Sequence, residues 1–397
     1  MVFEMVPNLN RILSFAKNKV YSFFIFFLVP LSYSASGPLR ESYRATRDLV
    51  DHPHTGAIDQ SRHLHAAQRA VDNYKLAKDE KIPEIYQPGQ MWKNILENVL
   101  TYRTWKLQQD DRVLYDALYQ FYRSDLVQSH SGDIYIWEIE NNHIDLKKQV
   151  FMIIRRYRAF ISRRLSFDYH AVTTTDVGQN IYVDYEGKKI TFKVIRFAHY
   201  LDRIIKNLHT GPDSIIGELG VGAGELSILT KKVLPGCRYI CFDLPETLMV
   251  ASYNIMMTSP DKKIGLYQDF AGKGKITREV IRNYDCILLP NWCIDRVGDD
   301  ALDLFINIAS LSEMDRPIIK NYIENIERVC NGHMYTVNRN VKGVAQFGAE
   351  DIALEEFPFS EKSRIISAEY DVASDMYHQR YGMDYECFYW EFIVKLR

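Results

Sequence analysis

The chain has 397 residues, a formal net charge of −2, a pI near 6.6 and 47% hydrophobic residues. A charge balance this close to neutral provides no global positive field, which argues against nucleic acid as a partner and against charge-driven binding to anionic membranes. One doubly wound sheet needs roughly 200 to 250 residues, so we expect a second module beside it.

The first 36 residues contain an apolar run of 12 residues, from Val20 to Leu31, preceded by basic residues. This run has the length of a signal-peptide core and is short for a membrane span. Three interpretations stay open: a signal or membrane anchor, a helix that makes peripheral contact with a membrane surface or a partner, and a segment docked on the protein. We treat residues 1–36 as a separate segment.

Residues 37–165 are expected to form a mainly helical module. Apolar side chains recur at three-to-four spacing in residues 61–77, 91–107, 112–122 and 146–165. The module also holds four closely spaced histidines, which are His52, His54, His63 and His65. No carboxylate or cysteine stands at ligand spacing to them, so solvated histidines are favoured over a metal site.

The six cysteines all lie in the second half of the chain and form no Cys-x-x-Cys pair; they are Cys237, Cys241, Cys286, Cys293, Cys330 and Cys387. Buried free thiols in a reducing compartment are therefore expected, which favours a cytoplasmic protein. Membrane association through residues 20–31 is the alternative.

The residues from 181 onward predict a second kind of architecture. Residues 181–185 and 189–192 indicate a β-hairpin, and a helix is expected over residues 193–208. An apolar run at residues 215–216 then leads into Glu218, Gly220, Gly222 and Gly224, followed by a helical pattern. A further apolar run ends on Asp243, about 20 residues beyond the glycines, where a ribose-binding acid is expected.

The spacing of the glycines indicates which nucleotide binds. The dinucleotide fingerprint Gly-x-Gly-x-x-Gly requires a glycine at the position of Glu225, and a carboxylate there would repel a diphosphate. Acids on both sides of the loop instead suit a ligand with a cationic end.

The pattern Glu-x-Gly-x-Gly-x-Gly resembles motif I of the class I S-adenosylmethionine-dependent methyltransferases. The resemblance implies that the three glycines face the methionine part of the cofactor and that Glu218 supports the loop or the ammonium group. It also implies that Asp243 holds the ribose, and that Arg196 and Tyr200 are candidates for the methionine carboxylate.

The rest of the chain predicts strands at residues 286–289, 302–308, 333–338, 364–371 and 386–395, with helices at 245–257 and 317–330. Residues 264–267 are strand-like as well. Together with the glycine loop, these elements predict an α/β fold: a Rossmann-like sheet over residues 166–397, mostly parallel with an antiparallel last strand.

Further motifs resemble the bacterial sugar O-methyltransferases. They occur in order between residues 170 and 345 and read DLPET at 243–247, LLPNW at 288–292, DLFIN at 303–307 and YTVNR at 335–339. The resemblance implies methyl transfer to a hydroxyl of a sugar or glycoconjugate, as in polysaccharide biosynthesis. It adds Leu244, Pro290 and Asn291 to the expected cofactor site.

Methylation of an alcohol requires a general base, because an alcohol is a weak nucleophile at neutral pH. Glu313 is the first candidate, with His333 and Asp295 behind it, and Asn307 is expected to orient substrate or cofactor. A structural role for Glu313, as an acid at a helix N-terminus, is the alternative. No dedicated set of metal ligands is visible.

Two other functions remain open at this point. A nicotinamide-dependent oxidoreductase would use the same type of sheet, although the third glycine is displaced from its fingerprint. A Rossmann-like interaction module without catalysis would keep the glycine loop as architecture alone.

Overall fold

The computed structural model describes residues 37–52, 59–99, 110–124, 139–141, 145–161, 165–340, 350, 352–374 and 389–397. The apolar run at residues 20–31 lies outside this part, and so does Cys387. Among the helices of the described residues, none is long and apolar enough to cross a membrane.

An eight-stranded sheet lies at the centre of the fold, in the order β5-β6-β4-β3-β7-β8-β10-β9. The strands are β3 (Ile215–Leu219), β4 (Arg238–Asp243), β5 (Ile264–Leu266), β6 (Cys286–Pro290), β7 (Leu302–Ile308), β8 (Cys330–Arg339), β9 (Arg364–Tyr370) and β10 (Tyr389–Lys395). Strands β3 to β8 run parallel, and β10 is antiparallel to both of its neighbours. The predicted Rossmann-like sheet with an antiparallel last strand is confirmed.

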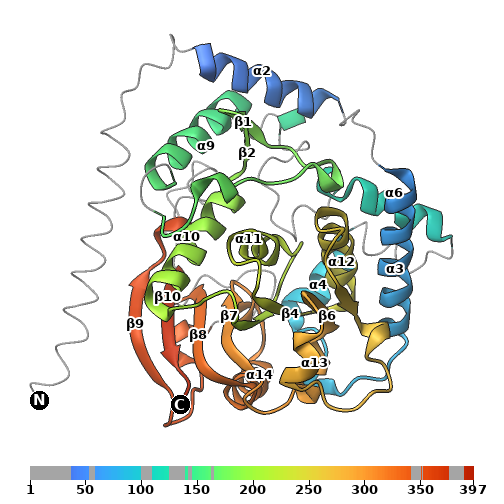
Figure 1. Ribbon diagram of the computed structural model, residues 1–397, viewed down its shortest axis with the longest axis vertical. Helices are drawn as coiled ribbons and strands as arrows, with labels where there is room; N and C mark the ends of the chain where they lie inside the picture. Colours follow the sequence, from blue (N-terminus) through green and yellow to red (C-terminus); the bar gives the residue numbers. More distant parts are fainter. Residues whose placement is uncertain are drawn as a thin grey trace, which may run out of the picture.

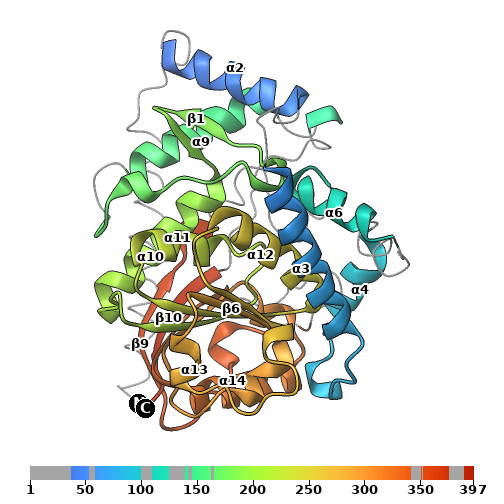
Figure 2. The same cartoon turned by 45° about the vertical axis from the view of Figure 1, so that its right-hand side comes forward.

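Helices cover both faces of this sheet (Figures 1 and 2). One face carries α10 (Phe192–Leu208), α11 (Glu225–Val233) and α12 (Pro245–Thr258), and the other carries α13 (Arg278–Arg282) and α14 (Arg316–Val329). Alternate residues of each strand enter different cores: Tyr239 and Cys241 pack with α10 to α12, whereas Ile240 and Phe242 pack with α14. Because both faces of the strands are buried in this way, most residues of these strands are apolar.

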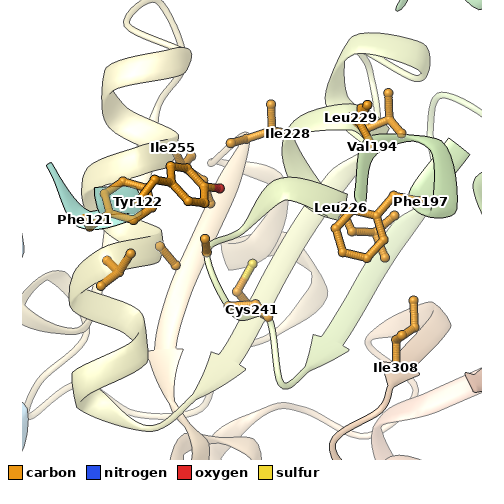
Figure 3. Packing of buried hydrophobic residues seen from close by; sticks show 14 of the residues in the cluster. Phe121, Tyr122, Val194, Phe197, Leu226, Ile228, Leu229, Cys241, Ile255 and Ile308 are labelled. Atoms are coloured by element: carbon orange, nitrogen blue, oxygen red, sulfur yellow. The ribbon is translucent and has the colours of Figure 1, made fainter. Parts of the chain in front are cut away.

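The residues before the sheet form helices α2 (Gly37–Asp51), α3 (Gln60–Lys78), α4 (Gln90–Asn98), α6 (Asp111–Tyr119) and α9 (Leu146–Phe160), and a hairpin of β1 (Val183–Tyr185) and β2 (Lys188–Ile190). Helix α3 lies along α12, where His63 Nδ1 is 2.8 Å from the Tyr253 hydroxyl and Arg62 donates to the Met257 carbonyl. Phe121 belongs to the same hydrophobic core as Ile255 of α12 (Figure 3). Residues before and after position 165 therefore share one hydrophobic core.

Several boundaries differ from those predicted. Helix α4 ends at Asn98, because Val99 takes an extended conformation, and residues 100–107 of the helix predicted at 91–107 lie outside the described part. The helix predicted to reach Cys330 ends at Val329, because Cys330 is already extended as the first residue of β8. Residues 264–266 form the edge strand β5, beside β6.

Candidate functional site

A cavity of about 140 Å³ opens at the carboxyl edge of the sheet, where the chain leaves β3 and β7 toward opposite sides. This is the switch point at which doubly wound sheets bind ligands. The lining comes from the loop after β3, the ends of β4 and β7, the first turn of α10, the start of α14, and the segment from Gln87 to Trp92.

The glycine loop presents its main chain to this cavity. Gly220 has φ +80° and its N–H donates to the Phe242 carbonyl at 2.9 Å; a Cβ atom at Gly220 would overlap the Ser310 side chain. Gly222 has φ +55°, and a Cβ atom there would have no heavy atom within 4 Å. The first glycine thus permits close packing behind the loop, and the second leaves space on the ligand side.

Asp243 closes the same wall from the end of β4. Its Oδ2 accepts from the Gly222 N–H at 3.1 Å, and its Oδ1 accepts from the Leu244 N–H at 2.8 Å. Burial raises the pKa of this carboxyl to about 7, although the backbone N–H bonds oppose the shift. Each carboxylate oxygen has a second lone pair, so Asp243 can still accept from hydroxyl groups of a ligand.

Glu218 of β3 is buried just before the loop and is one of the residues that line the cavity. The Tyr239 hydroxyl donates to Glu218 Oε2 at 2.9 Å. Burial raises the pKa of Glu218 to about 8, so most of this group is protonated at neutral pH while the cavity contains no cation.

Two basic side chains of α10, Lys193 and Arg196, line the other side of the cavity. Both are buried, and Lys193 forms an ion pair with Glu225, the first residue of α11. Lys193 was missed by the sequence prediction, although the i, i+3, i+4 spacing of Lys193, Arg196 and Phe197 places them on one helix face. Tyr200 lies elsewhere: its hydroxyl donates to Asp371 Oδ2 at 2.6 Å.

Glu313 lines the same cavity as the glycine loop and belongs to the short 3₁₀ helix η7 (Leu311–Glu313). The indole N–H of Trp92 donates to Glu313 Oε2 at 2.8 Å. Desolvation raises the pKa of Glu313 to about 7, against the opposing effects of the Trp92 bond and of the Arg339 charge. A carboxyl group with this pKa can exchange a proton near neutral pH.

Asn307 is fully buried and does not line the cavity. Its Nδ2 donates to the Leu219 carbonyl at 3.0 Å and to Ser310 Oγ at 2.5 Å, and its Oδ1 accepts from Asn338 Nδ2 at 2.8 Å. The side chain connects the ends of β3, β7 and β8. The structure therefore gives Asn307 contacts that hold the edge of the sheet together, in place of the predicted contact with substrate or cofactor.

The two other candidate bases, His333 and Asp295, do not line the cavity. His333 lies near the start of β8, opposite Lys395 of β10, whereas the cavity lies beyond the other end of the strand, about 20 Å away at 3.3 Å per residue. Asp295 accepts a hydrogen bond from the Tyr86 hydroxyl and is not part of the lining. Glu313 is the one of the three candidates that lines the cavity.

Of the remaining predicted cofactor residues, Leu244 and Asn291 line the cavity, whereas Pro290 and Gly224 do not. Gly224 instead lies against α12, where a Cβ atom would meet the Ile255 side chain. Asn291 Nδ2 donates to the Tyr86 carbonyl at 2.8 Å and to the Tyr322 hydroxyl at 2.7 Å. The segment from Gln87 to Trp92 was missed altogether, because no local pattern connects it with strands about 200 residues later in the chain.

A second cluster, formed by His199, Asp371 and Glu391, lies apart from the cavity. Their ligand atoms all lie within 4.8 Å of one another. Glu391 already accepts from Tyr335 at 2.7 Å and from Arg203 at 3.3 Å. Because the guanidinium group of Arg203 neutralises the charge of Glu391, we interpret this cluster as an internal ion-pair network.

No protein-family profile matches the chain, and no curated protein matches it either. Among solved structures, the YcgJ protein of Bacillus subtilis matches 50% of this chain and 95% of its own, with 13% identity and a TM-score of 0.31. The [4+2]-cyclase SpnF matches 51% of this chain and 81% of its own, with 10% identity and a TM-score of 0.34.

A phosphoethanolamine N-methyltransferase of Haemonchus contortus, solved with phosphomonomethylethanolamine and S-adenosylhomocysteine, matches 50% of this chain and 52% of its own. Its identity is 9% and its TM-score 0.33. Similarities this low carry no argument about function, so the assignment of the fold depends on the strand order and direction described above.

Proposed function

We propose that this chain is an S-adenosylmethionine-dependent methyltransferase. The observation that carries the proposal is the convergence of the Glu218 glycine loop and the Asp243 carboxyl on one cavity at the switch point of the sheet. The open side of Gly222 leaves room for a ligand against the main chain.

The charges around the cavity fit this cofactor. Asp243 would accept hydrogen bonds from the ribose hydroxyls, and Glu218 would face the cationic part. Lys193 and Arg196 stand on the side where the methionine carboxylate would be neutralised. When bound, the cofactor supplies an electrophilic methyl group on a sulfonium.

The proposed acceptor is a hydroxyl group of a sugar or glycoconjugate, on the basis of the motif resemblance. Glu313 would take the hydroxyl proton as the oxygen–carbon bond forms and the carbon–sulfur bond breaks, which leaves a methyl ether and S-adenosylhomocysteine. Its raised pKa suits a base that works near neutral pH. Alignment of acceptor and methyl group in the cavity would supply much of the remaining acceleration.

Calorimetric titration of the full chain with S-adenosylhomocysteine and, separately, with NAD tests the proposal. Micromolar binding of the first alone is expected. Binding of NAD alone would assign the chain to the oxidoreductases, and binding of neither would favour an interaction module.

The acceptor class requires a second experiment, in which transfer of a labelled methyl group from S-adenosylmethionine is measured against a panel of sugars, nucleotide sugars and oligosaccharides, with phenols and amines as comparison. Label in a methyl ether of a sugar supports the proposed acceptor. Transfer to amines or phenols alone would contradict it and leave the cofactor assignment intact.

A further inference from the structure

Helix α4 reaches the candidate site from a distant part of the sequence. Trp92 and Glu313 are separated by 221 positions, yet the indole N–H lies 2.8 Å from Glu313 Oε2. Gln87, Pro88 and Gly89 line the cavity together with Trp92, so this segment forms the wall next to Glu313.

The segment is held in place by Tyr86, which is buried just before it. The Tyr86 carbonyl accepts from Asn291, and its hydroxyl donates to Asp295 and accepts from Asn325 at 3.1 Å. Its ring lies edge-on to Tyr322 with the centroids 5.8 Å apart. Since these partners belong to the Rossmann-like half, α4 is fixed relative to the sheet edge.

We propose that Trp92 is a positioning residue for the catalytic base: its indole N–H holds Glu313 Oε2 and leaves Oε1 to receive the proton of the acceptor. This inference rests on the proposed function, because it assumes that Glu313 is the base.

The chemistry of the indole supports this role. An indole N–H only donates, so its bond to a carboxyl oxygen is stronger when that carboxyl is ionised. The charged groups that face Glu313 come from two further elements: Arg339 of β8 favours the ionised form, and Asp243 of β4 disfavours it. Trp92 therefore acts with Arg339 to keep Glu313 available as a base.

The contact can be tested without any substrate, by ¹⁹F NMR of the full chain labelled with 5-fluorotryptophan. The chain has five tryptophans. One resonance should shift with a midpoint near pH 7; Trp92→Phe should remove that resonance, and Glu313→Gln should make its position constant with pH. The matched control is Trp390→Phe, because Trp390 of β10 lies edge-on to Tyr370 of β9; this variant should remove a different resonance.

A Trp92 resonance that does not shift with pH, or that shifts equally in Glu313→Gln, would overturn the proposal. The wild type and Glu313→Gln decide this even if Trp92→Phe fails to fold. Because the measurement needs no cofactor, it can fail while S-adenosylhomocysteine binds as expected, and a failure of the proposed function is seen separately in the calorimetric titration.

The catalytic consequence is a shift of the pH profile. We expect the acidic limb of the pH profile of kcat to move to higher pH by about one unit in Trp92→Phe, measured with the acceptor found in the methyl-transfer screen. A shift of this size is expected when a charged group loses one hydrogen bond. Affinity for S-adenosylhomocysteine should stay within about twofold of wild type. A uniform fall of kcat with an unmoved limb would mean that Trp92 only fills space.

Discussion

The Asp243 carboxyl faces two backbone N–H groups and the cavity at the same time. We expect Asp243→Ala to weaken binding of S-adenosylhomocysteine at least tenfold, about 1.4 kcal/mol, because the ribose loses an acceptor. Calorimetry would measure the affinity, and circular dichroism would confirm the fold. Asp184→Ala, on the exposed side of β1, is the control. An unchanged affinity in Asp243→Ala would remove this residue from the site.

The raised pKa values of Glu218 and Asp243, about 8 and about 7, predict a pH-dependent preference for the charged cofactor. S-Adenosylmethionine carries a sulfonium cation that S-adenosylhomocysteine lacks. The two carboxyl groups ionise as the pH rises from about 6 to 8.5. The affinity for S-adenosylmethionine should therefore increase by about tenfold more than the affinity for S-adenosylhomocysteine.

Paired titrations of both ligands at each pH measure this difference. Glu218→Gln should flatten the dependence, since Gln keeps the acceptor for Tyr239 but has no charge to gain. A ratio of affinities that is constant with pH in the wild type would contradict the predicted role of the acids.

At the scale of the elements, Gly220 and Gly222 of the glycine loop should respond differently to substitution by alanine. Gly222→Ala costs roughly 1 to 2 kcal/mol of backbone strain at φ +55°, but its methyl group enters the cavity, so we expect a folded protein with weakened cofactor binding. Gly220→Ala forces a methyl group into Ser310, so the free energy of unfolding should fall by about 3 kcal/mol or more.

Urea denaturation measures the change in the free energy of unfolding of each variant, independently of its affinity for the cofactor. Ser310→Gly added to Gly220→Ala should restore part of the lost stability, because it removes the atoms that the new methyl group meets. Equal stability losses in the two single variants would contradict this account of the loop.

The part of the site that could be predicted from sequence is the local part. The glycine loop and the acid at the end of the next strand follow one another within about 30 residues, so periodicity and spacing locate them. Asn307 and His333 show the limit: both occur in predicted strands, but periodicity does not state whether a polar side chain bonds to neighbouring strands or which strand end it occupies. The place of Trp92 in the site depends on how α4 packs against the sheet edge, and no local sequence pattern predicts that packing.

For the whole molecule, the site acids make stability depend on pH. In the folded state the pKa values of Glu218, Asp243 and Glu313 are about 8, 7 and 7, above their ordinary values of 4.5, 3.8 and 4.5. Between these limits the folded state binds more protons than the unfolded state, so the free energy of unfolding falls as the pH rises from about 5 to 8.

Thermal unfolding of the chain without ligand should therefore show a higher Tm at pH 6 than at pH 8. The double variant Glu218→Gln with Glu313→Gln should lose part of this slope, because two of the groups no longer titrate. A slope that is identical in the wild type and the double variant would show that these acids ionise in the folded state as they do in water.

The sheet itself was predictable because β3, β4, β6 and β7 are mostly apolar, as is typical of strands buried on both faces. The association of the N-terminal helices with the sheet was not. Contacts such as His63 with Tyr253 join residues 190 positions apart, and amphipathic periodicity predicts that a helix face is buried without stating its partner.

The long sequence separation of the Tyr86 and Trp92 contacts imposes an order on how the site is built during synthesis. Gly222 and Asp243 are 21 positions apart, so the glycine loop can meet its acid soon after both leave the ribosome. The partner of Trp92, Glu313, is synthesised 221 positions later, and Asn325, a partner of Tyr86, is synthesised 239 positions later. The nascent chain therefore acquires the cofactor side first and the wall beside Glu313 last.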